Sequence, residues 1–168
     1  MKKVKAFTLV EILIVVVLLG ILAAIVIPAF AGGAMSARSS ALAQDLRILQ
    51  RFILIYKSQH MEIAPGYANG NTANAPTEQA FIDQAILSSK TAGQTAAVGT
   101  AGYGRGPYLM KIPTNPINNL NTVQMLADGQ DFPADADNSH GWIYKAATNE
   151  MRSDCTGTDT KGTAFYTY

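Results

Sequence analysis

The chain has 168 residues, of which 48% are hydrophobic and only 15% charged, and its formal net charge is +1. No run or stripe of basic residues gives the surface that nucleic-acid binding requires, which argues against that class of function. Cys155 is the only cysteine, so an internal disulfide is excluded, and no group of His and Cys residues predicts a zinc site. The length allows one domain with an appendage.

The N-terminal 28 residues have the pattern of a membrane segment with one anomaly. Three lysines, at positions 2, 3 and 5, precede an apolar run that extends from Phe7 to Pro28. Such a run is long enough to span a bilayer, and the lysines predict that the N-terminal end stays in the cytoplasm. Only Thr8 and Glu11 interrupt its apolar character. An unpaired carboxylate in lipid costs several kcal/mol, so Glu11 calls for a partner.

Two ordinary interpretations fit the rest of this segment. A secretory signal peptide has a basic start, an apolar stretch and a small-residue cleavage site, which Ala29–Ala34 could supply. A plain signal anchor needs only the lysines and the apolar length. Neither interpretation gives Glu11 a role.

The order of the motifs, FTLVE at Phe7–Glu11, then the apolar run, then Pro28, resembles the class III signal of type IV pilins and of type II secretion pseudopilins. The resemblance implies that a prepilin peptidase removes a leader, residues 1–6, by cutting between Ala6 and Phe7. It also implies that the new amino terminus of Phe7 is methylated. Ala6 stands where the family usually has glycine.

The same resemblance gives Glu11 a physical role. Cleavage creates a cationic amine at Phe7, and this amine can pair with Glu11 of a neighbouring subunit and so fix the axial register of a filament. Residues 7–37 would form the transmembrane and filament-core helix, and residues 38–168 the globular head. The implied partners are further copies of the chain, minor pilins or pseudopilins, the prepilin peptidase, and the assembly platform of the bacterial inner membrane. The head would be periplasmic.

Beyond Pro28 the pattern predicts that the helix continues to about Ile63. Apolar residues recur at helical spacing and predict one buried stripe, formed by Leu42, Leu46, Leu49, Ile53, Tyr56, His60 and Ile63. Pro28, Gly32 and Gly33 predict a kink or a locally melted stretch, because proline removes a hydrogen bond and glycine weakens a helix. Ala64-Pro65-Gly66 is the predicted end.

The head is predicted to be α+β, with a pilin-like fold in which the second half of the long helix packs on a small antiparallel sheet. Thr77 can cap a short helix over residues 78–88. The segments Trp142–Tyr144 and Glu150–Arg152 predict a hairpin, and residues 164–168 a final strand. The strings GPYLMKIPTNP and GWIYKAATNEMR resemble the head of type II secretion pseudopilins, especially the major-pseudopilin-like group.

Four carboxylates are close together in the sequence ADGQDFPADADNSHGW: Asp128, Asp131, Asp135 and Asp137. Oxygen ligands of this kind suit calcium, and major pseudopilins bind calcium in a C-terminal loop, but the spacing is not that of an EF-hand. A solvated acidic loop without metal is the default interpretation. No other cofactor is expected.

No motif predicts catalysis, since the sequence lacks the patterns of nucleophilic, zinc-dependent and phosphate-binding enzymes. The predicted function is therefore structural, as a subunit of a type II secretion pseudopilus or a related filament. Type IVa pilins commonly have a pair of cysteines near the C-terminus, and this sequence has no such pair there. The resemblance is therefore closer to a secretion pseudopilin than to an adhesive or motility pilin. The alternative is a single-pass membrane-anchored binding module that does not assemble.

Overall fold

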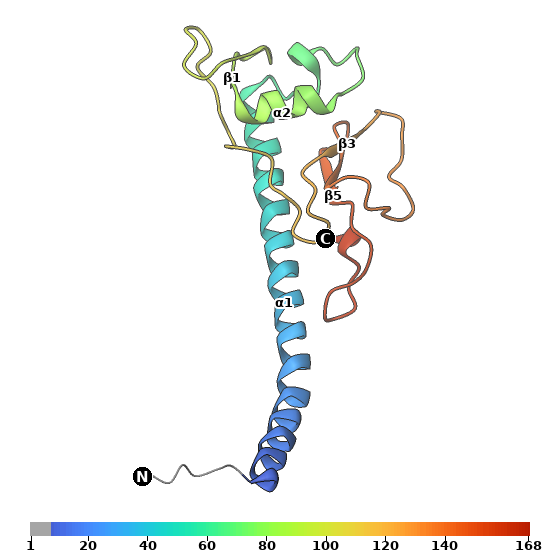
Figure 1. Ribbon diagram of the computed structural model, residues 1–168. Helices are drawn as coiled ribbons and strands as arrows, with labels where there is room; N and C mark the ends of the chain where they lie inside the picture. Colours follow the sequence, from blue (N-terminus) through green and yellow to red (C-terminus); the bar gives the residue numbers. More distant parts are fainter. Residues whose placement is uncertain (1–7) are drawn as a thin grey trace, which may run out of the picture. The chain divides into compact units, whose positions relative to one another are not determined.

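The computed structural model describes residues 8–168, with the backbone alone for residues 28–32. Contacts divide the chain into two compact units, Met1–Ala37 and Arg38–Tyr168. One helix, α1 (Leu9–Gln59), has its first part in the first unit and its second part in the second unit (Figure 1). The remaining helices and strands all belong to the second unit.

The first part of α1 is exposed on all its described sides. Leu9–Ile27 is a 19-residue stretch long and apolar enough to cross a membrane, and none of it is buried within the chain. At 1.5 Å per residue it measures about 28 Å, close to the thickness of a bilayer's hydrocarbon core. The predicted membrane-spanning segment is therefore present as a helix.

The helix α1 continues across the predicted helix break, so no melted stretch interrupts it in this structure. The backbone of α1 is α-helical through Pro28, Gly32 and Gly33. Proline in a helix interior costs about 3 kcal/mol, because it removes one hydrogen bond and its ring clashes with the preceding turn. The hydrogen bonds on either side still hold the helix together. A kink at this stretch, and its melting inside a filament, stay predictions.

The C-terminal end of α1 differs from the prediction by four residues. The helix ends at Gln59 instead of Ile63. Met61 and Glu62 both have positive φ angles, 56° and 61°, which end a right-handed helix. Their turn is closed by the Glu62 N–H, which donates to the carbonyl of Lys57 at 3.1 Å.

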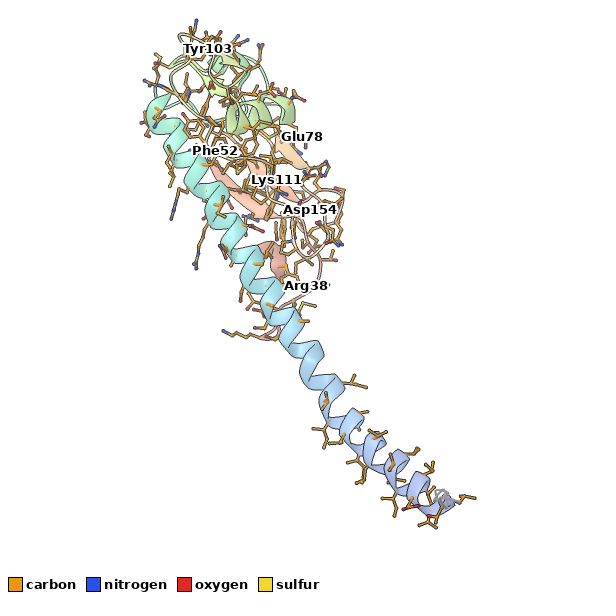
Figure 2. All side chains as sticks on the ribbon, turned by 60° about the vertical axis from the view of Figure 1, so that its left-hand side comes forward. Arg38, Phe52, Glu78, Tyr103, Lys111 and Asp154 are labelled. Carbon is orange, nitrogen blue, oxygen red and sulfur yellow. The ribbon has the colours of Figure 1, made fainter. Side chains whose placement is uncertain are left out.

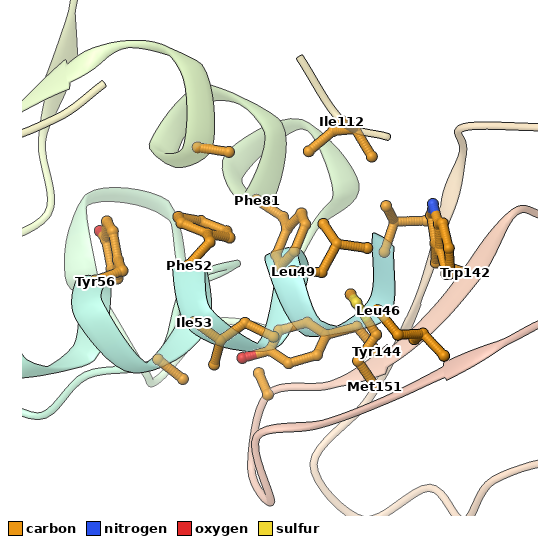
Figure 3. Close-up of a cluster of buried hydrophobic side chains, with 14 of the residues drawn as sticks. Leu46, Leu49, Phe52, Ile53, Tyr56, Phe81, Ile112, Trp142, Tyr144 and Met151 are labelled. Atoms are coloured by element: carbon orange, nitrogen blue, oxygen red, sulfur yellow. The ribbon is translucent and has the colours of Figure 1, made fainter. Parts of the chain in front are cut away.

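The predicted stripe forms the core of the second unit. Six of its seven residues are at most 3% exposed: Leu42, Leu46, Leu49, Ile53, Tyr56 and His60. Figure 3 shows Leu46, Leu49 and Ile53 in one cluster with Phe81 of the second helix and with Trp142, Tyr144 and Met151 of the sheet. Phe52 extends the stripe and meets Phe81 edge-to-face at 5.3 Å. The second half of α1 therefore packs on the sheet, as predicted.

The main sheet has the order β3-β4-β5, with β3 Val123–Leu126, β4 Trp142–Lys145 and β5 Glu150–Ser153. The predicted β4–β5 hairpin is confirmed as an antiparallel pair, and Asn149, with φ 60°, ends its turn. The sequence did not predict β3, which pairs with β4 in parallel. The α+β fold class is confirmed, with a third strand added to the hairpin.

Alternation along the strands gives this sheet two apolar faces. Trp142 and Tyr144 point into the cluster that contains α1, whereas Ile143 lies between them in a second cluster. In this second cluster Ile143 packs with Leu126 and Tyr166, and Phe132 and Ala136 cover them. The connection from β3 to β4 thus covers the face of the sheet that α1 does not cover.

The smaller elements surround this core. Helix α2 (Glu78–Ile86) begins where predicted, because the hydroxyl of Thr77 accepts from the Ala80 N–H at 3.2 Å. Two-residue strands β1 (Ser88–Ser89) and β2 (Thr95–Ala96) form an antiparallel pair, and η1 (Ala68–Gly70) is a 3₁₀ turn.

The predicted final strand is wrong. Phe165–Thr167 is a 3₁₀ turn, η2, closed by the Tyr168 N–H donating to the carbonyl of Phe165. Phe165 packs in the cluster that contains α1, and Tyr166 packs in the second cluster. A strand would also send neighbouring side chains to opposite sides, so the apolar pattern of residues 164–168 does not distinguish a strand from a 3₁₀ turn.

His60 fastens the end of α1 to the core. Its ring is 1% exposed and stacks on Tyr56 with centroids 3.7 Å apart. Its Nδ1 lies 2.7 Å from the carbonyl of Tyr56, and its Nε2 lies 2.9 Å from the hydroxyl of Ser89. The neutral ring satisfies both contacts, with Nδ1 as donor. Burial lowers the pKa of His60, and the nearby Arg105 lowers it further.

This lowered pKa predicts that the protein loses stability in mild acid. The unfolded chain takes up a proton near pH 6.5 while the folded chain does not, so the contribution of His60 is full above that pH and declines as pH falls below it. Melting temperatures measured between pH 7.5 and 5 should show this decline in wild type and in His140→Gln. His60→Gln should have a lower melting temperature at neutral pH, and its melting temperature should fall less steeply between pH 7.5 and 5. An unchanged slope in His60→Gln would contradict this role.

Candidate functional site

The candidate assembly site is the start of α1. The predicted cleavage residues, Ala6 and Phe7, lie outside the described residues. Glu11 is described and lies in the first turn of the helix. Its place at the helix start, rather than in the middle of the apolar stretch, puts its charge near the positive end of the helix dipole.

Glu11 and Thr8 form a reciprocal capping box. The Thr8 N–H donates to Glu11 Oε2 at 2.8 Å, and the Thr8 hydroxyl donates to the same oxygen at 3.0 Å. In return, Thr8 Oγ1 accepts from the Glu11 N–H at 3.2 Å. Two backbone donors that the helix cannot satisfy are thereby satisfied.

The capping box is a signal that the sequence reading missed. The letters T-L-V-E at residues 8–11 match the pattern of a threonine followed three residues later by glutamate. It turns the Glu11 carboxylate back toward the backbone of Thr8. Thr8 directly follows Phe7 in the sequence, the residue before which cleavage is predicted.

The surface around Glu11 is apolar and uncovered. Leu9 is 85% exposed, and Ile12, Leu13 and Val16 are all more than half exposed. Together with Thr8 these four side chains line a shallow groove along the helix. Figure 2 shows the side chains of this segment standing out from the ribbon on several sides. This arrangement suits lateral contact with lipid or with other helices.

The four aspartates considered for calcium do not converge on one point. The Tyr67 hydroxyl donates to Asp128 at 2.5 Å, and Asp131 lies 3.6 Å from Lys145 Nζ. Asp137 accepts from the Ser139 N–H at 2.8 Å, and Asp135 is exposed. Within residues 8–168 no group of three or more His, Cys, Asp or Glu side chains is placed to hold a metal ion. Calcium binding by this segment stays a prediction.

Asp154 is a buried carboxylate that the sequence reading did not single out. It is 1% exposed and accepts from the backbone N–H groups of Asp137 and His140 at 2.9 and 2.8 Å. The side chain of Asn118 donates to its backbone carbonyl. These bonds fix the end of the β3–β4 connection. An aspartate directly after a strand carries no pattern that would distinguish it from a turn residue.

The capping box predicts that Thr8→Val destabilises the start of α1 by about 1 kcal/mol, because valine has the shape of threonine but no hydroxyl. Amide hydrogen exchange of the full chain in detergent micelles should become faster at Glu11, whose N–H loses its acceptor. Thr8→Ser keeps the hydroxyl and should exchange like wild type. Equal exchange at Glu11 in Thr8→Val and wild type would contradict the capping box.

Comparisons with known proteins agree with this geometry. Residues 1–27 match the family described as the prokaryotic N-terminal methylation motif. Over 130 residues the chain is 30% identical to type II secretion system core protein G of Klebsiella pneumoniae, which covers 77% of this chain and 79% of that protein. It is also 30% identical over 124 residues to the protein of the same description from Aeromonas hydrophila. That alignment covers 74% of this chain and 73% of the relative. No solved structure gives a significant match. The methylation motif, the capped apolar helix and the similarity through the head agree, and the chain belongs to the family of type II secretion system core protein G, the major pseudopilins.

Proposed function

We infer that this chain is a structural subunit of a type II secretion pseudopilus, made as a membrane-anchored precursor and polymerised through α1. The observation that carries this function is the helix Leu9–Ile27, whose 19 residues are unburied and whose only charged residue is Glu11. Such a surface has to be covered by lipid before assembly and by other helices after it.

Assembly exchanges lipid contacts of α1 for contacts with other copies. Lipid tails are as apolar as leucine side chains, so the hydrophobic effect alone does not favour this exchange. Close packing and polar contacts between helices have to supply the free energy instead. Glu11 is the residue of the apolar helix able to supply a strong and directional polar contact.

The partner of Glu11 is the methylated amine of Phe7 in a neighbouring copy. A carboxylate left unpaired among packed helices is unfavourable, whereas a carboxylate with a cationic partner is tolerated. Copies in the wrong axial register leave both charges unpaired, so the pair selects one register. The capping box supports this role because it holds the carboxylate at the helix start.

The other partners are inferred from the family to which the chain belongs. A prepilin peptidase cuts between Ala6 and Phe7, minor pseudopilins join the same filament, and the inner-membrane assembly platform adds subunits. The three lysines at positions 2, 3 and 5 keep the leader in the cytoplasm and the head in the periplasm. The role is structural and not catalytic.

The processing step predicts a defined mature N-terminus. Mass spectrometry of the protein purified from cells that contain the peptidase should find a chain that begins with N-methylated Phe7. Ala6→Gly should be processed at least as completely, and Ala6→Leu should accumulate as precursor because the larger side chain obstructs the cut. A chain that retains Met1, or one that begins near Ala34, would contradict the proposal.

The charge of Glu11 can be tested separately from its capping bonds. Glu11→Gln keeps an oxygen that can accept from Thr8 but has no charge, so it should insert into membranes normally and give markedly fewer filaments. Glu11→Leu should behave similarly. Ile12→Leu, a neighbouring apolar exchange, is the control and should assemble like wild type. Normal filament yield from Glu11→Gln would rule out the charge pair.

A further inference from the structure

The outward side of the second half of α1 has an unusual composition. Helical spacing places Arg47, Ile48, Arg51, Leu54 and Ile55 on the side opposite the buried stripe, and we call these five residues the basic face. Its aliphatic members are 38%, 65% and 40% exposed, for Ile48, Leu54 and Ile55 respectively. The face contains no carboxylate.

The two arginines of the basic face are available for a partner. Within residues 8–168 neither Arg47 nor Arg51 forms an ion pair or a hydrogen bond. Arg51 and Ile55 also line a small apolar groove with Phe52 and Tyr108. Arginine and large apolar side chains without acidic residues are a composition enriched in protein interfaces.

The C-terminal part of the head is richer in acidic residues than the rest. Residues 38–122 carry seven basic and four acidic side chains, whereas residues 123–168 carry three basic and seven acidic. Four of the acids lie in residues 128–137, here called the acidic segment. Its Asp131 side chain is fully exposed, and Asp135 has no ion pair or hydrogen bond within the described residues.

The sheet separates the basic face from the acidic segment. The stripe of α1 packs on one face of the sheet, and Phe132 and Ala136 of the acidic segment pack on the other. Figure 1 likewise shows the connection after β3 on the side of the sheet away from α1. Contacts with the sheet hold the segment in place: Arg152 of β5 lies over the ring of Phe132 at 4.2 Å, and Lys145 of β4 lies beside Asp131. The two surfaces therefore cannot meet within one copy.

We propose that the basic face of one copy binds the acidic segment of the next copy in the filament, as a head-to-head contact in addition to the packing of the N-terminal helices. This proposal rests on the proposed function. One chain that carries complementary charges on opposite sides forms a heterologous contact, which repeats without closing and gives a helical fibre. Such charge complementarity favours the correct neighbour and disfavours like-charged approaches.

Cross-linking of assembled filaments tests which surfaces meet. Full-length chains with Arg51→Cys and with Asp135→Cys are expressed together, and sheared filaments are treated with a short thiol cross-linker. Cys155 is 1% exposed and should not react. A mixed dimer is expected, whereas Lys90→Cys with Asp135→Cys, in which Lys90 is exposed but outside the basic face, should give none. Intact filaments without the mixed dimer, or with only dimers of Arg51→Cys with itself, would overturn the proposal.

Charge reversal tests whether the contact is electrostatic. Arg51→Glu and Asp135→Arg should each lower filament yield about threefold to tenfold, and the double variant should restore it. Lys111→Glu, an exposed reversal outside both surfaces, should assemble like wild type. Unchanged melting temperatures would show that folding is intact. Full yield from Arg51→Glu, or loss without rescue in the double variant, would overturn the pairing.

These outcomes are distinct from failure of the proposed function. If wild type itself forms no filaments in the presence of the peptidase and the assembly platform, the proposed function fails. If wild type assembles and Glu11→Gln does not, while Arg51→Glu assembles fully, the function holds and the head-to-head contact is wrong. If Arg51→Glu lowers the amount of membrane-bound precursor instead of filament yield, the basic face contacts lipid headgroups, and the proposal is again wrong.

Discussion

The apolar surface of Leu9–Ile27 is covered by no other part of the described chain, and this constraint governs the rest of the molecule. A helix of this kind is stable only in lipid or among other helices. It has to change from the first environment to the second without passing through water. A subunit that is first inserted in a membrane and then drawn into a filament meets this requirement.

Within that apolar surface, the capping box satisfies backbone N–H groups at the helix start and also fixes the position of the Glu11 carboxylate. The first turn of any helix leaves backbone N–H groups unsatisfied, and in lipid no water is present to satisfy them. Thr8 and Glu11 satisfy two of them. The same bonds hold the carboxylate at the end of the helix, where the amine of a processed neighbour would have to arrive.

The head adds a second set of contacts of a different physical kind. Its sheet is apolar on both faces, so α1 covers one face and the β3–β4 connection the other. This layering places the arginines of α1 and the aspartates of the connection on opposite sides of the head. Contacts between exposed charges weaken as salt rises, whereas contacts in the buried filament core depend much less on salt. The two sets of contacts can therefore be separated by ionic strength.

Much of this structure could be predicted from the sequence, for identifiable reasons. The stripe through Leu42 and Tyr56 has strong helical spacing, and Thr77 has the pattern of an N-cap. Strand β3 could not be predicted, because its four residues gain their place only by pairing with β4, far along the chain. The end of α1 is set by Met61 and Glu62, whose positive φ angles no sequence pattern around them encodes. The capping box could have been predicted from Thr8 and Glu11, which have its spacing. The same residues belong to the FTLVE motif of the family, and that motif alone was used to interpret them.

The measurement that tests the central claim most directly is a cryo-electron microscopy reconstruction of the filament formed by this chain. We expect the Phe7 amine of each subunit to lie within about 4 Å of the Glu11 carboxylate of a neighbouring subunit, the distance of an ion pair. A well-resolved filament core in which Glu11 contacts only its own Thr8, with every Phe7 amine remote from a neighbour's carboxylate, would contradict the account.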